Sequence, residues 1–526
     1  MRREIMVKAI KDNPDKVWDT VVIGGGATGL GTAVESVTRG YETLLLEQAD
    51  FSKGTSSRST KLVHGGVRYL AQGDISLVLE ALHERGLLRQ NAPHLVKDLA
   101  FVIPIYEWWD GPFYAVGMKV YDMMAGKLGL GPSVRISKEE TLKAIPNIKK
   151  KGLRGGVIYY DGQFDDSRLA INLAQTISKN NGTIINYMKV TNLTKNDIGL
   201  VDGLVVYDIE SEKEYKIKAK VVVNATGVFV DDVLKMDDPK AKKTTRPSQG
   251  VHVVLDKEFL QSKSAIMIPK TDDGRVLFAV PWHNRVVVGT TDTLVDDASL
   301  EPRALEKEIE FILKTAGRYL TRAPKRKDVL SIFAGLRPLA AVEENDQSTK
   351  EISRNHKILV SLSGLVTITG GKWTTYRKMG EDAVDKASLV AGLEEKQCIT
   401  KNMPIHGYVK NFDPDDHLHV YGSDRLGILQ LIEENPDMGK QLHESLEFTK
   451  AEVVWAVREE MARKVEDVLA RRVRALYLDA RVSMEMAEKV AVIMAKELGK
   501  DKNWIKHEVK EFKALAEGYI LKKHKH

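Results

Sequence analysis

The stretch WDTVVIGGGATGLGTAVESVTRGYETLLLE, residues 18–47, decides the fold. It holds a β-branched run at residues 20–23, the pattern G-x-G-x-x-G at Gly24, Gly26 and Gly29, and an apolar run at 41–46 that ends at Glu47. Short apolar runs indicate buried strands, and the glycine-spaced segment between them predicts a tight turn that opens a helix. Strand, turn, helix and strand in this order, followed by an acid, predict a dinucleotide site in an α/β domain.

Each glycine of the pattern has its own task. Gly24 permits the turn, Gly26 lets the backbone approach a pyrophosphate, and Gly29 lets helix and strand pack closely. The phosphates are expected at the helix N-terminus, where unpaired N–H groups and the helix dipole favour negative charge. Glu47 would accept hydrogen bonds from an adenosine ribose and would repel a 2′-phosphate, which leaves NAD or FAD.

Length and composition indicate a globular protein of two or three domains. The chain has 526 residues, of which 43% are hydrophobic and 29% charged. The net charge of +6 is small for this length, so we expect no nucleic-acid partner, although an anionic substrate or a membrane surface would suit it. Cys398 is the single cysteine. Disulfides within the chain and Cys-ligated metal centres are therefore excluded, and we predict no metal site and a reducing compartment.

The N-terminal segment, residues 1–19, lacks the apolar run of a signal peptide. No run of 18 or more apolar residues occurs, so no helix is expected to span a bilayer. These features predict a cytoplasmic location for the body of the protein.

A polar segment rich in small residues, residues 48–70, follows the first unit. We expect Ser57, Thr60, Lys61 and His64 within it to contact the cofactor, because small residues let backbone approach a ligand. Arg68 offers a planar fork for a carboxylate or phosphate. The alternative is a solvated turn with an incidental arginine.

Residues 75–91 are predicted to form an amphipathic helix, and residues 101–131 are rich in aromatics. Part of this second segment could lie on a membrane through apolar side chains beside Lys119 and Lys127; equally, the side chains could line a core. The residues concerned are Trp108, Trp109, Phe113, Tyr114, Met118, Tyr121, Met123 and Met124.

Two later segments resemble further parts of a flavin site. Residues 220–224 form an apolar strand that runs into Ala225 and Gly227, and residues 364–369 run into Gly370 and Gly371 before a predicted helix. The second segment is not a Walker A loop, because Val366 replaces its first glycine. Three remote segments thus point to one flavin-binding domain.

The remaining chain completes an α/β fold: an FAD-binding Rossmann-like domain, an inserted antiparallel β-sheet substrate domain and a C-terminal all-helical domain. The FAD-binding segments are about 15–75, 155–235 and 345–390, the substrate domain about 76–154 and 240–344, and the helical domain 396–526. Within the last, a long helix is predicted over 449–478, opened by the capping box Thr449/Glu452, and another over 483–498, stopped by Gly499.

The sequence closely resembles the FAD-dependent glycerol-3-phosphate dehydrogenases over most of its length. The resemblance lies in GGGATGLGTA, TSSRSTKLVHGGVRYL, VVVNATGVFVD, SQGVHVVL, AGLRPL, ISRNH and TGGKWTTYRKMGEDAVD. It implies oxidation of sn-glycerol 3-phosphate to dihydroxyacetone phosphate by hydride transfer from C2 to flavin N5. It also implies electron transfer to a membrane quinone and peripheral attachment to a bacterial inner membrane. Longer relatives carry EF-hands, and no such loop occurs here. A homodimer is left open.

The resemblance places a substrate pocket on Arg68, Tyr69, His252, Arg337, Arg354 and Lys372. A phosphate monoester needs two or more cationic donors, which these residues would supply.

Removal of the C2 hydroxyl proton requires a base. His252 is the first choice, because an imidazole titrates near neutral pH. A core histidine, or an arginine that stabilises the developing alkoxide while water takes the proton, remains an alternative. Lys372 could contact substrate or the flavin N1/C2 region. An oxidase that passes electrons to O₂ and makes H₂O₂, and a flavin- or NAD-binding sensor without turnover, are the competing functions.

Overall fold

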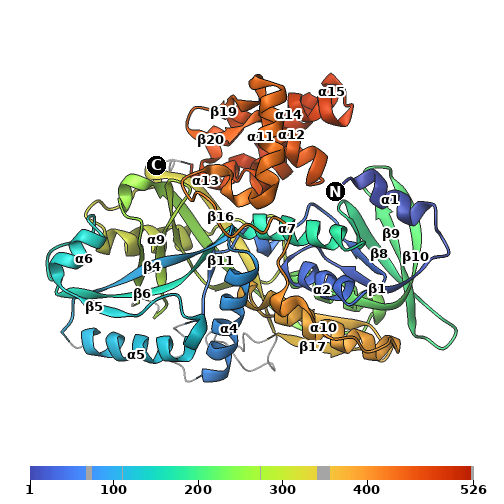
Figure 1. The fold of residues 1–526 in the computed structure, drawn as a ribbon, viewed down its shortest axis with the longest axis horizontal. Coiled ribbons are helices and arrows are strands. Elements are labelled where there is room, and N and C mark those ends of the chain that lie inside the picture. The colour runs from blue at the N-terminus through green and yellow to red at the C-terminus, as the bar shows by residue number, and fades with distance from the viewer. Residues whose placement is uncertain (67–73, 109, 270, 273, 341–355, 523–526) are drawn as a thin grey trace.

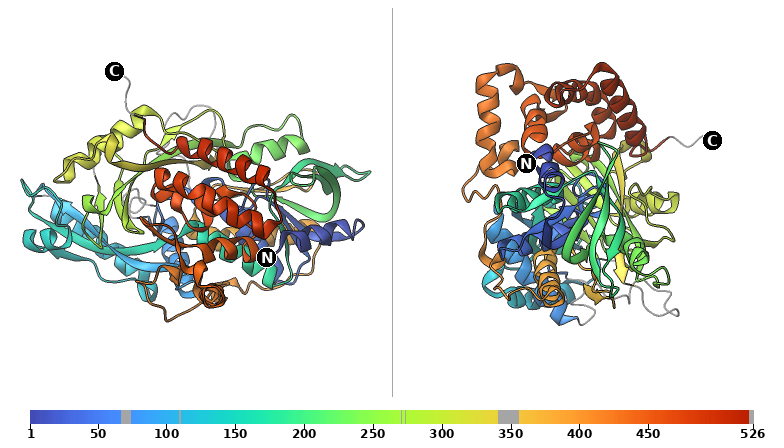
Figure 2. Two further views of the ribbon diagram at one scale, coloured as in Figure 1. Left: turned by 90° about the horizontal axis from the view of Figure 1, so that it is seen from above. Right: turned by 90° about the vertical axis from the view of Figure 1, so that its right-hand side faces the viewer.

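The computed structural model describes residues 1–66, 74–108, 110–269, 271–272, 274–340 and 356–522. Two sheets form a body, and a helical C-terminal domain lies across it (Figures 1 and 2). The α/β fold with a helical C-terminal domain is thus as predicted, although that domain is not all-helical, because a two-stranded sheet, β19 (Gln441–His443) with β20 (Leu446–Thr449), lies within it.

The first sheet carries the glycine turn. Its order is β17-β18-β10-β1-β2-β7, and β8 and β9 extend it from β10. The strands are β1 (Val17–Ile23), β2 (Thr43–Leu46), β7 (Thr183–Ile185), β8 (Met188–Lys195), β9 (Val201–Asp208), β10 (Lys213–Asn224), β17 (Lys357–Val360) and β18 (Val366–Thr369). The helices beside it are α1 (Arg3–Lys11), α2 (Ala27–Thr38), α7 (Asp166–Lys179), α8 (Val230–Asp237) and α10 (Tyr376–Ala391).

Strand β1 is buried on both faces, as its apolar run predicts for a central parallel strand. Val22 packs with the helices α2, α7 and α10, whereas Val21 and Ile23 point to the opposite face, toward β8, β9 and α8. Side chains that alternate in direction along β1 thus pack into two apolar cores, one on each face of the sheet. Packing against the helices on one face holds the end of β1 in place.

The second sheet is the inserted layer, with the order β15-β11-β14-β13-β12-β4-β6-β3; β16 pairs with β11 and β5 with β6. Its strands are β3 (Leu62–Val63), β4 (Val96–Ile105), β5 (Val134–Ile136), β6 (Gly155–Phe164), β11 (Thr245–Asp256), β12 (Ala265–Ile268), β13 (Leu277–Trp282), β14 (Arg285–Gly289), β15 (Thr293–Leu294) and β16 (Val329–Ala340). Its helices are α4 (Ile75–Asn91), α5 (Asp110–Ala125), α6 (Lys138–Ala144) and α9 (Glu306–Tyr319).

Two features of this sheet differ from expectation. The sheet is mixed rather than antiparallel, because β12 and β4 pair in parallel where the two inserted segments meet. Strands β3 and β6 belong to it, although their residues fall within the predicted FAD-binding segments. Antiparallel pairing of β4 and β6 extends over ten residue pairs, and this continuous pairing makes β6 a strand of the second sheet.

The C-terminal domain holds α11 (Arg425–Glu434), β19 (Gln441–His443), β20 (Leu446–Thr449), α12 (Lys450–Glu459), α13 (Ala475–Leu478), α14 (Ala480–Leu498) and α15 (Lys502–Glu517). The capping box at Thr449 and Glu452 is confirmed, as is the end of α14 at Gly499. The apolar core of this domain continues into the second sheet through Val254 and Phe333.

The single long helix predicted over 449–478 is wrong. The segment breaks into α12, a π-helical stretch (Asp467–Arg472) and α13, with Met461 and Arg474 in left-handed backbone conformations. Buried guanidinium contacts with the body hold the segment in this shape, and apolar periodicity cannot register them.

The apolar segment after β4 divides between core and surface. Met118 and Tyr121 of α5 are buried, whereas Trp108, Phe113 and Met123 are exposed. Trp109 lies outside the described residues. Among the described residues, no helix is long and apolar enough to cross a membrane.

Candidate active site

The glycine turn joins β1 to α2 in the predicted manner. Gly24 has a φ of +110°, and a Cβ on Gly29 would lie 1.9 Å from the Gly24 carbonyl oxygen. The close strand–helix approach therefore requires glycine at position 29. Helix α2 begins at Ala27 without a side-chain cap on Gly26, and Ala27 N donates to Ser56 Oγ at 2.9 Å. Sequence reasoning did not single out Ser56.

Glu47 links the end of β2 to this turn. Its carboxylate accepts hydrogen bonds from Gly25 N at 2.6 Å and from Ala49 N at 2.8 Å. Burial raises the pKa of Glu47, while the two backbone N–H groups oppose that shift. The acid thus stands beside the glycine turn, at the carboxyl end of its strand.

Parallel pairing brings the three cofactor segments together. Ile23 of β1 is in register with Asn224 of β10, and Asn224 is in register with Thr367 of β18. Because parallel strands end at one edge of a sheet, the glycine turn, residues 225–227 and residues 370–371 meet there.

A cavity of about 470 Å³ lies at this edge. Its walls include eight of the predicted site residues: Gly24, Gly26, Glu47, Ala225, Gly227, Gly370, Gly371 and Lys372. Met188, Lys189 and Val190 of β8, and residues 52–56, complete them. A cavity of this size suits an organic cofactor. A dinucleotide also fits its chemistry, because a helix N-terminus, an acid and a lysine surround it. A Cβ on Gly24 would lie 2.7 Å from the Ala225 oxygen, so glycine at this position lets the first and second segments meet.

Trp373 is a second residue that sequence reasoning did not assign to the site. It follows Lys372 in the cavity wall, and its Nε1 donates to Ser56 O at 2.8 Å. This bond ties the third cofactor segment to the segment that crosses the N-terminus of α2. The polar, small-residue composition of 48–70 was the signal that could have identified Ser56.

His252 lies on β11 and does not line the cavity. The Oγ1 atom of Thr60 is 2.9 Å from His252 Nε2, and the imidazole stacks on Phe333 with ring centroids 5.0 Å apart. Burial, with further contributions from the charges of Lys61 and Arg337, lowers the pKa of His252 well below its ordinary value. The expectation that this imidazole titrates near neutral pH is therefore wrong, because the side chain is desolvated and faces two cations.

Arg337 lies on the same face of the sheet. Ser248 pairs with Arg337 and His252 pairs with Phe333, so these four side chains share one side. The guanidinium lies over Gly250, where a Cβ would be 2.3 Å from Arg337 Nη2. Its Nη2 donates to Thr290 Oγ1 at 3.0 Å. The next residue, Pro338, lines the cavity, whereas Arg337 points to the other face of β16 and does not line it.

Ser57, Lys61 and His64 do not line the cavity. Ser57 Oγ is 3.1 Å from Tyr477 OH, and Lys61 Nζ donates to Asp166 at 2.6 Å with no exposed surface on either side chain. His64 N donates to Thr374 Oγ1 at 3.2 Å. Three further predicted substrate residues, Arg68, Tyr69 and Arg354, lie outside the described residues.

Comparisons with known proteins agree with this geometry. The family described as "FAD dependent oxidoreductase" matches residues 19–377, and "C-terminal domain of alpha-glycerophosphate oxidase" matches residues 398–504. The probable mitochondrial glycerol-3-phosphate dehydrogenase of Caenorhabditis elegans is 39% identical, over 95% of this chain and 72% of that protein. The mitochondrial glycerol-3-phosphate dehydrogenase of Schizosaccharomyces pombe is 37% identical, over 95% of this chain and 87% of that protein.

Solved structures with the same fold include two flavoproteins. The glycerol-3-phosphate dehydrogenase from Bacillus halodurans, complexed with FAD, matches with a TM-score of 0.81 and 28% identity, covering 99% of this chain and 100% of that chain. The L-alpha-glycerophosphate oxidase from Mycoplasma pneumoniae, with FAD bound, matches with a TM-score of 0.57 and 18% identity, over 74% of this chain and 98% of that chain. The second likeness concerns the fold alone.

Proposed function

Since the chain belongs to the FAD-dependent glycerol-3-phosphate dehydrogenase family, we propose that it oxidises sn-glycerol 3-phosphate to dihydroxyacetone phosphate and passes the electrons to a membrane quinone. The observation that carries the proposal is the meeting of three remote glycine segments around one cavity with Lys372 in its wall; Arg337 is the neighbour in β16 of Pro338, which lines the same cavity. Bound FAD supplies the two-electron acceptor for the hydride that leaves C2.

The chain holds the cofactor mainly through backbone. The N-terminus of α2 binds the pyrophosphate, and Glu47 accepts hydrogen bonds from the ribose. Gly227 and Gly371, both with positive φ, let the second and third segments approach without a Cβ. Lys372 places a positive charge at the cavity, where it favours a reduced, anionic cofactor or a bound phosphate.

Arg337 binds and orients the substrate phosphate in this proposal. Its hydrogen bond to Thr290 and its contact with Asp292 at 3.4 Å fix the plane of the guanidinium, so little rotamer freedom is lost on binding. Arg68, Tyr69 and Arg354 remain proposed partners in the same pocket.

In this proposal His252 accepts the proton, and it does so as a neutral imidazole. Its lowered pKa keeps the ring uncharged at neutral pH, ready to accept a proton but weak as a base. Negative charge from a bound phosphate would offset the charge of Arg337 and strengthen it. In the alternative mechanism Arg337 stabilises the developing alkoxide and water takes the proton.

Attachment to a membrane surface is proposed through α5. Phe113, Val116, Val120 and Met123 recur at helical spacing along its exposed side. The helix lies along the edge of the body opposite the C-terminal domain (Figure 1). An exposed apolar stripe of this kind suits a helix that lies in the headgroup region of a bilayer, the phase that also holds the proposed quinone acceptor.

Anaerobic addition of glycerol 3-phosphate to the purified yellow protein tests the reaction. We expect bleaching of the flavin absorbance and release of dihydroxyacetone phosphate. If the spectrum of the FAD-bound protein does not change, glycerol 3-phosphate is excluded as its substrate.

Oxidation by O₂ is the second candidate, because the C-terminal region matches the family description of a glycerophosphate oxidase domain. Hydrogen peroxide measured per substrate turnover in air, with and without added quinone, separates the two. Stoichiometric peroxide without quinone reduction would favour the oxidase.

A further inference from the structure

Residues 50–61 cross from the end of β2 to the second sheet and line the cofactor cavity through Ser52–Ser56. We propose that Arg471, Arg472 and Arg474 of the C-terminal domain are positioning residues that hold both ends of this segment and thereby control FAD retention. The inference rests on the FAD site of the proposed function and does not depend on the substrate.

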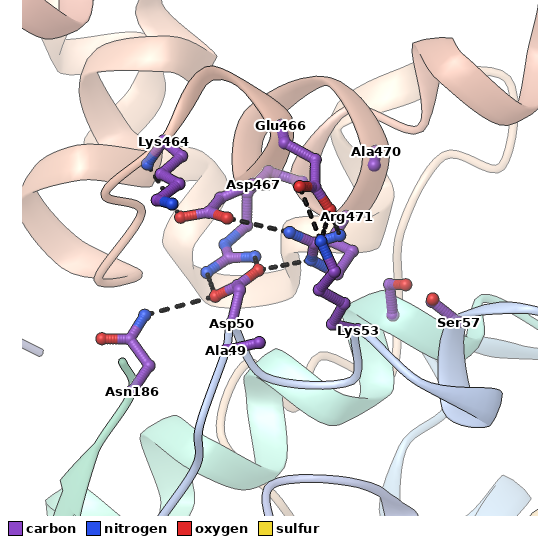
Figure 3. Close-up of polar contacts among 12 residues, drawn as sticks. Ala49, Asp50, Lys53, Ser57, Asn186, Lys464, Glu466, Asp467, Ala470 and Arg471 are labelled. Carbon is purple, nitrogen blue, oxygen red and sulfur yellow. Dashed lines mark hydrogen bonds and ion pairs between the residues drawn. The ribbon is translucent and has the colours of Figure 1, made fainter. Parts of the chain in front are cut away.

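The first end of the segment is Asp50. Arg471 Nε donates to its Oδ2 atom at 2.6 Å (Figure 3). Arg472 Nη1 and Nη2 donate to its two carboxylate oxygens at 2.8 and 2.9 Å. None of these three side chains is more than 1% exposed. Burial alone would raise the pKa of Asp50, but the charges of Arg472 and Arg471 lower it. Asp50 therefore remains a carboxylate, three residues after Glu47.

A second ion pair reaches the cavity wall itself. Lys53 Nζ donates to both carboxylate oxygens of Glu466 at 2.8 Å, and Glu466 accepts from Arg471 Nη1 at 2.7 Å (Figure 3). Lys53 lines the cavity, whereas Glu466 belongs to the C-terminal domain. A chain of opposite charges thus connects the cofactor site to the turn before Arg471.

The other end of the segment is held through Asp166, at the start of α7. Arg474 Nη2 donates to Asp166 Oδ1 at 2.8 Å and to Ser57 O at 3.3 Å. The second oxygen of Asp166 accepts from Ser59 Oγ at 2.7 Å and from Lys61 Nζ at 2.6 Å. Contacts with Arg474 of the C-terminal domain and with Asp166 therefore hold residues 57–61 in place, and Thr60 lies against His252.

The backbone of the C-terminal domain is shaped for these contacts. Asp467–Arg472 is π-helical, a rare form frequent at functional sites, and Arg474 has a φ of +64°. A left-handed arginine costs conformational free energy and persists where the surroundings enforce it. Buried ion pairs often stabilise a fold no better than apolar side chains of the same volume, so this concentration of charge favours a role in fixing one geometry.

The rate of FAD release from the full-length holoprotein, followed by flavin fluorescence after dilution, tests the inference. Arg472→Met and Glu466→Gln should each release FAD roughly 10-fold or more faster, the scale of a typical coupling between two sites. Glu466 is 15% exposed, and Glu466→Gln preserves the shape of the side chain. This variant therefore provides the test if the Arg472→Met protein does not fold.

Arg85→Gln is the matched control. Arg85 forms a similarly buried pair with Asp161 at 2.8 Å between α4 and β6, and its hydrogen-bond partners, Asp161 and the Leu128 carbonyl, lie outside residues 50–61 and 460–474. This variant should lower the melting temperature yet keep the wild-type rate of FAD release. Equal acceleration in the control would show general destabilisation and would overturn the inference.

Reciprocity gives a second readout without turnover. If the C-terminal domain tightens FAD binding, FAD must stabilise the C-terminal domain by the same factor. Hydrogen exchange of amides 467–476 should slow when FAD is added to the wild type, and less so in Glu466→Gln. Wild-type release rates in both folded variants, with no FAD effect on exchange, would refute the positioning role. Glycerol 3-phosphate enters neither measurement, so failure of the proposed reaction would be seen separately.

Discussion

Replacement of two apolar side chains on α5 should detach the protein from vesicles without loss of its fold. Phe113 and Met123 are 66% and 78% exposed, so serine at either position opens no cavity. Burying a side chain of this size is worth about 1.5–3 kcal/mol, and roughly two thirds of that is available here. The double change should therefore cost about 2–4 kcal/mol of partition free energy, or roughly 30-fold to several hundred-fold in vesicle binding.

Flotation of the holoprotein with liposomes that contain anionic lipid measures this partition, and reduction of a soluble dye measures the catalytic body. Leu426→Ser is the control, because Leu426 is 71% exposed on α11 of the C-terminal domain, on the opposite side of the molecule from α5 (Figure 1). Wild-type flotation of the Phe113→Ser/Met123→Ser protein would refute the assignment of this face to the membrane. Loss of dye reduction and of the thermal transition would instead show that the two side chains support the core.

Four further outcomes follow from the site. Arg337→Ala should raise KM and lower kcat/KM by roughly 10², and near wild-type kinetics would exclude Arg337 from the pocket. Glu47→Ala should weaken FAD binding, yet leave KM unchanged at saturating FAD. Because the pKa of His252 lies well below 6.5, kcat/KM should show no acidic limb near that pH; a limb there that His252→Gln abolishes would contradict this. Burial lowers the pKa of Lys61 from 10.5 to about 8, so its charge destabilises the fold below pH 8 and this penalty fades as pH rises to 10.5. Over that range wild type should gain about 3 kcal/mol of unfolding free energy relative to Lys61→Met, as urea titrations at each pH would measure.

Local patterns predicted the parts of the site that depend on neighbours in sequence. The glycine turn, the acid at Glu47, the helix over 75–91 and the cap at Gly499 all agree with the structure. Each depends on a backbone requirement or a periodicity that a short window of residues carries.

Contacts between remote residues were missed. Ser56 and Trp373 are 317 positions apart, and no sequence pattern in either segment predicts their hydrogen bond. The lowered pKa of His252 likewise depends on burial and on two cations from other segments. Sequence gives the identity of an ionisable group, but its charge state depends on its surroundings.

The break in the predicted helix over 449–478 has the same origin. The apolar stripe is real, but Arg471, Arg472 and Arg474 pair with Asp50 and Asp166, more than 300 residues away. The amino-acid sequence alone determined the dinucleotide class of the cofactor and the α/β framework, because glycine spacing and strand periodicity are local, and its motifs carried the resemblance to the family. Tertiary structure alone decided which charges are buried together and how the C-terminal domain contacts residues 50–61, because desolvation and ion pairing depend on distance in space.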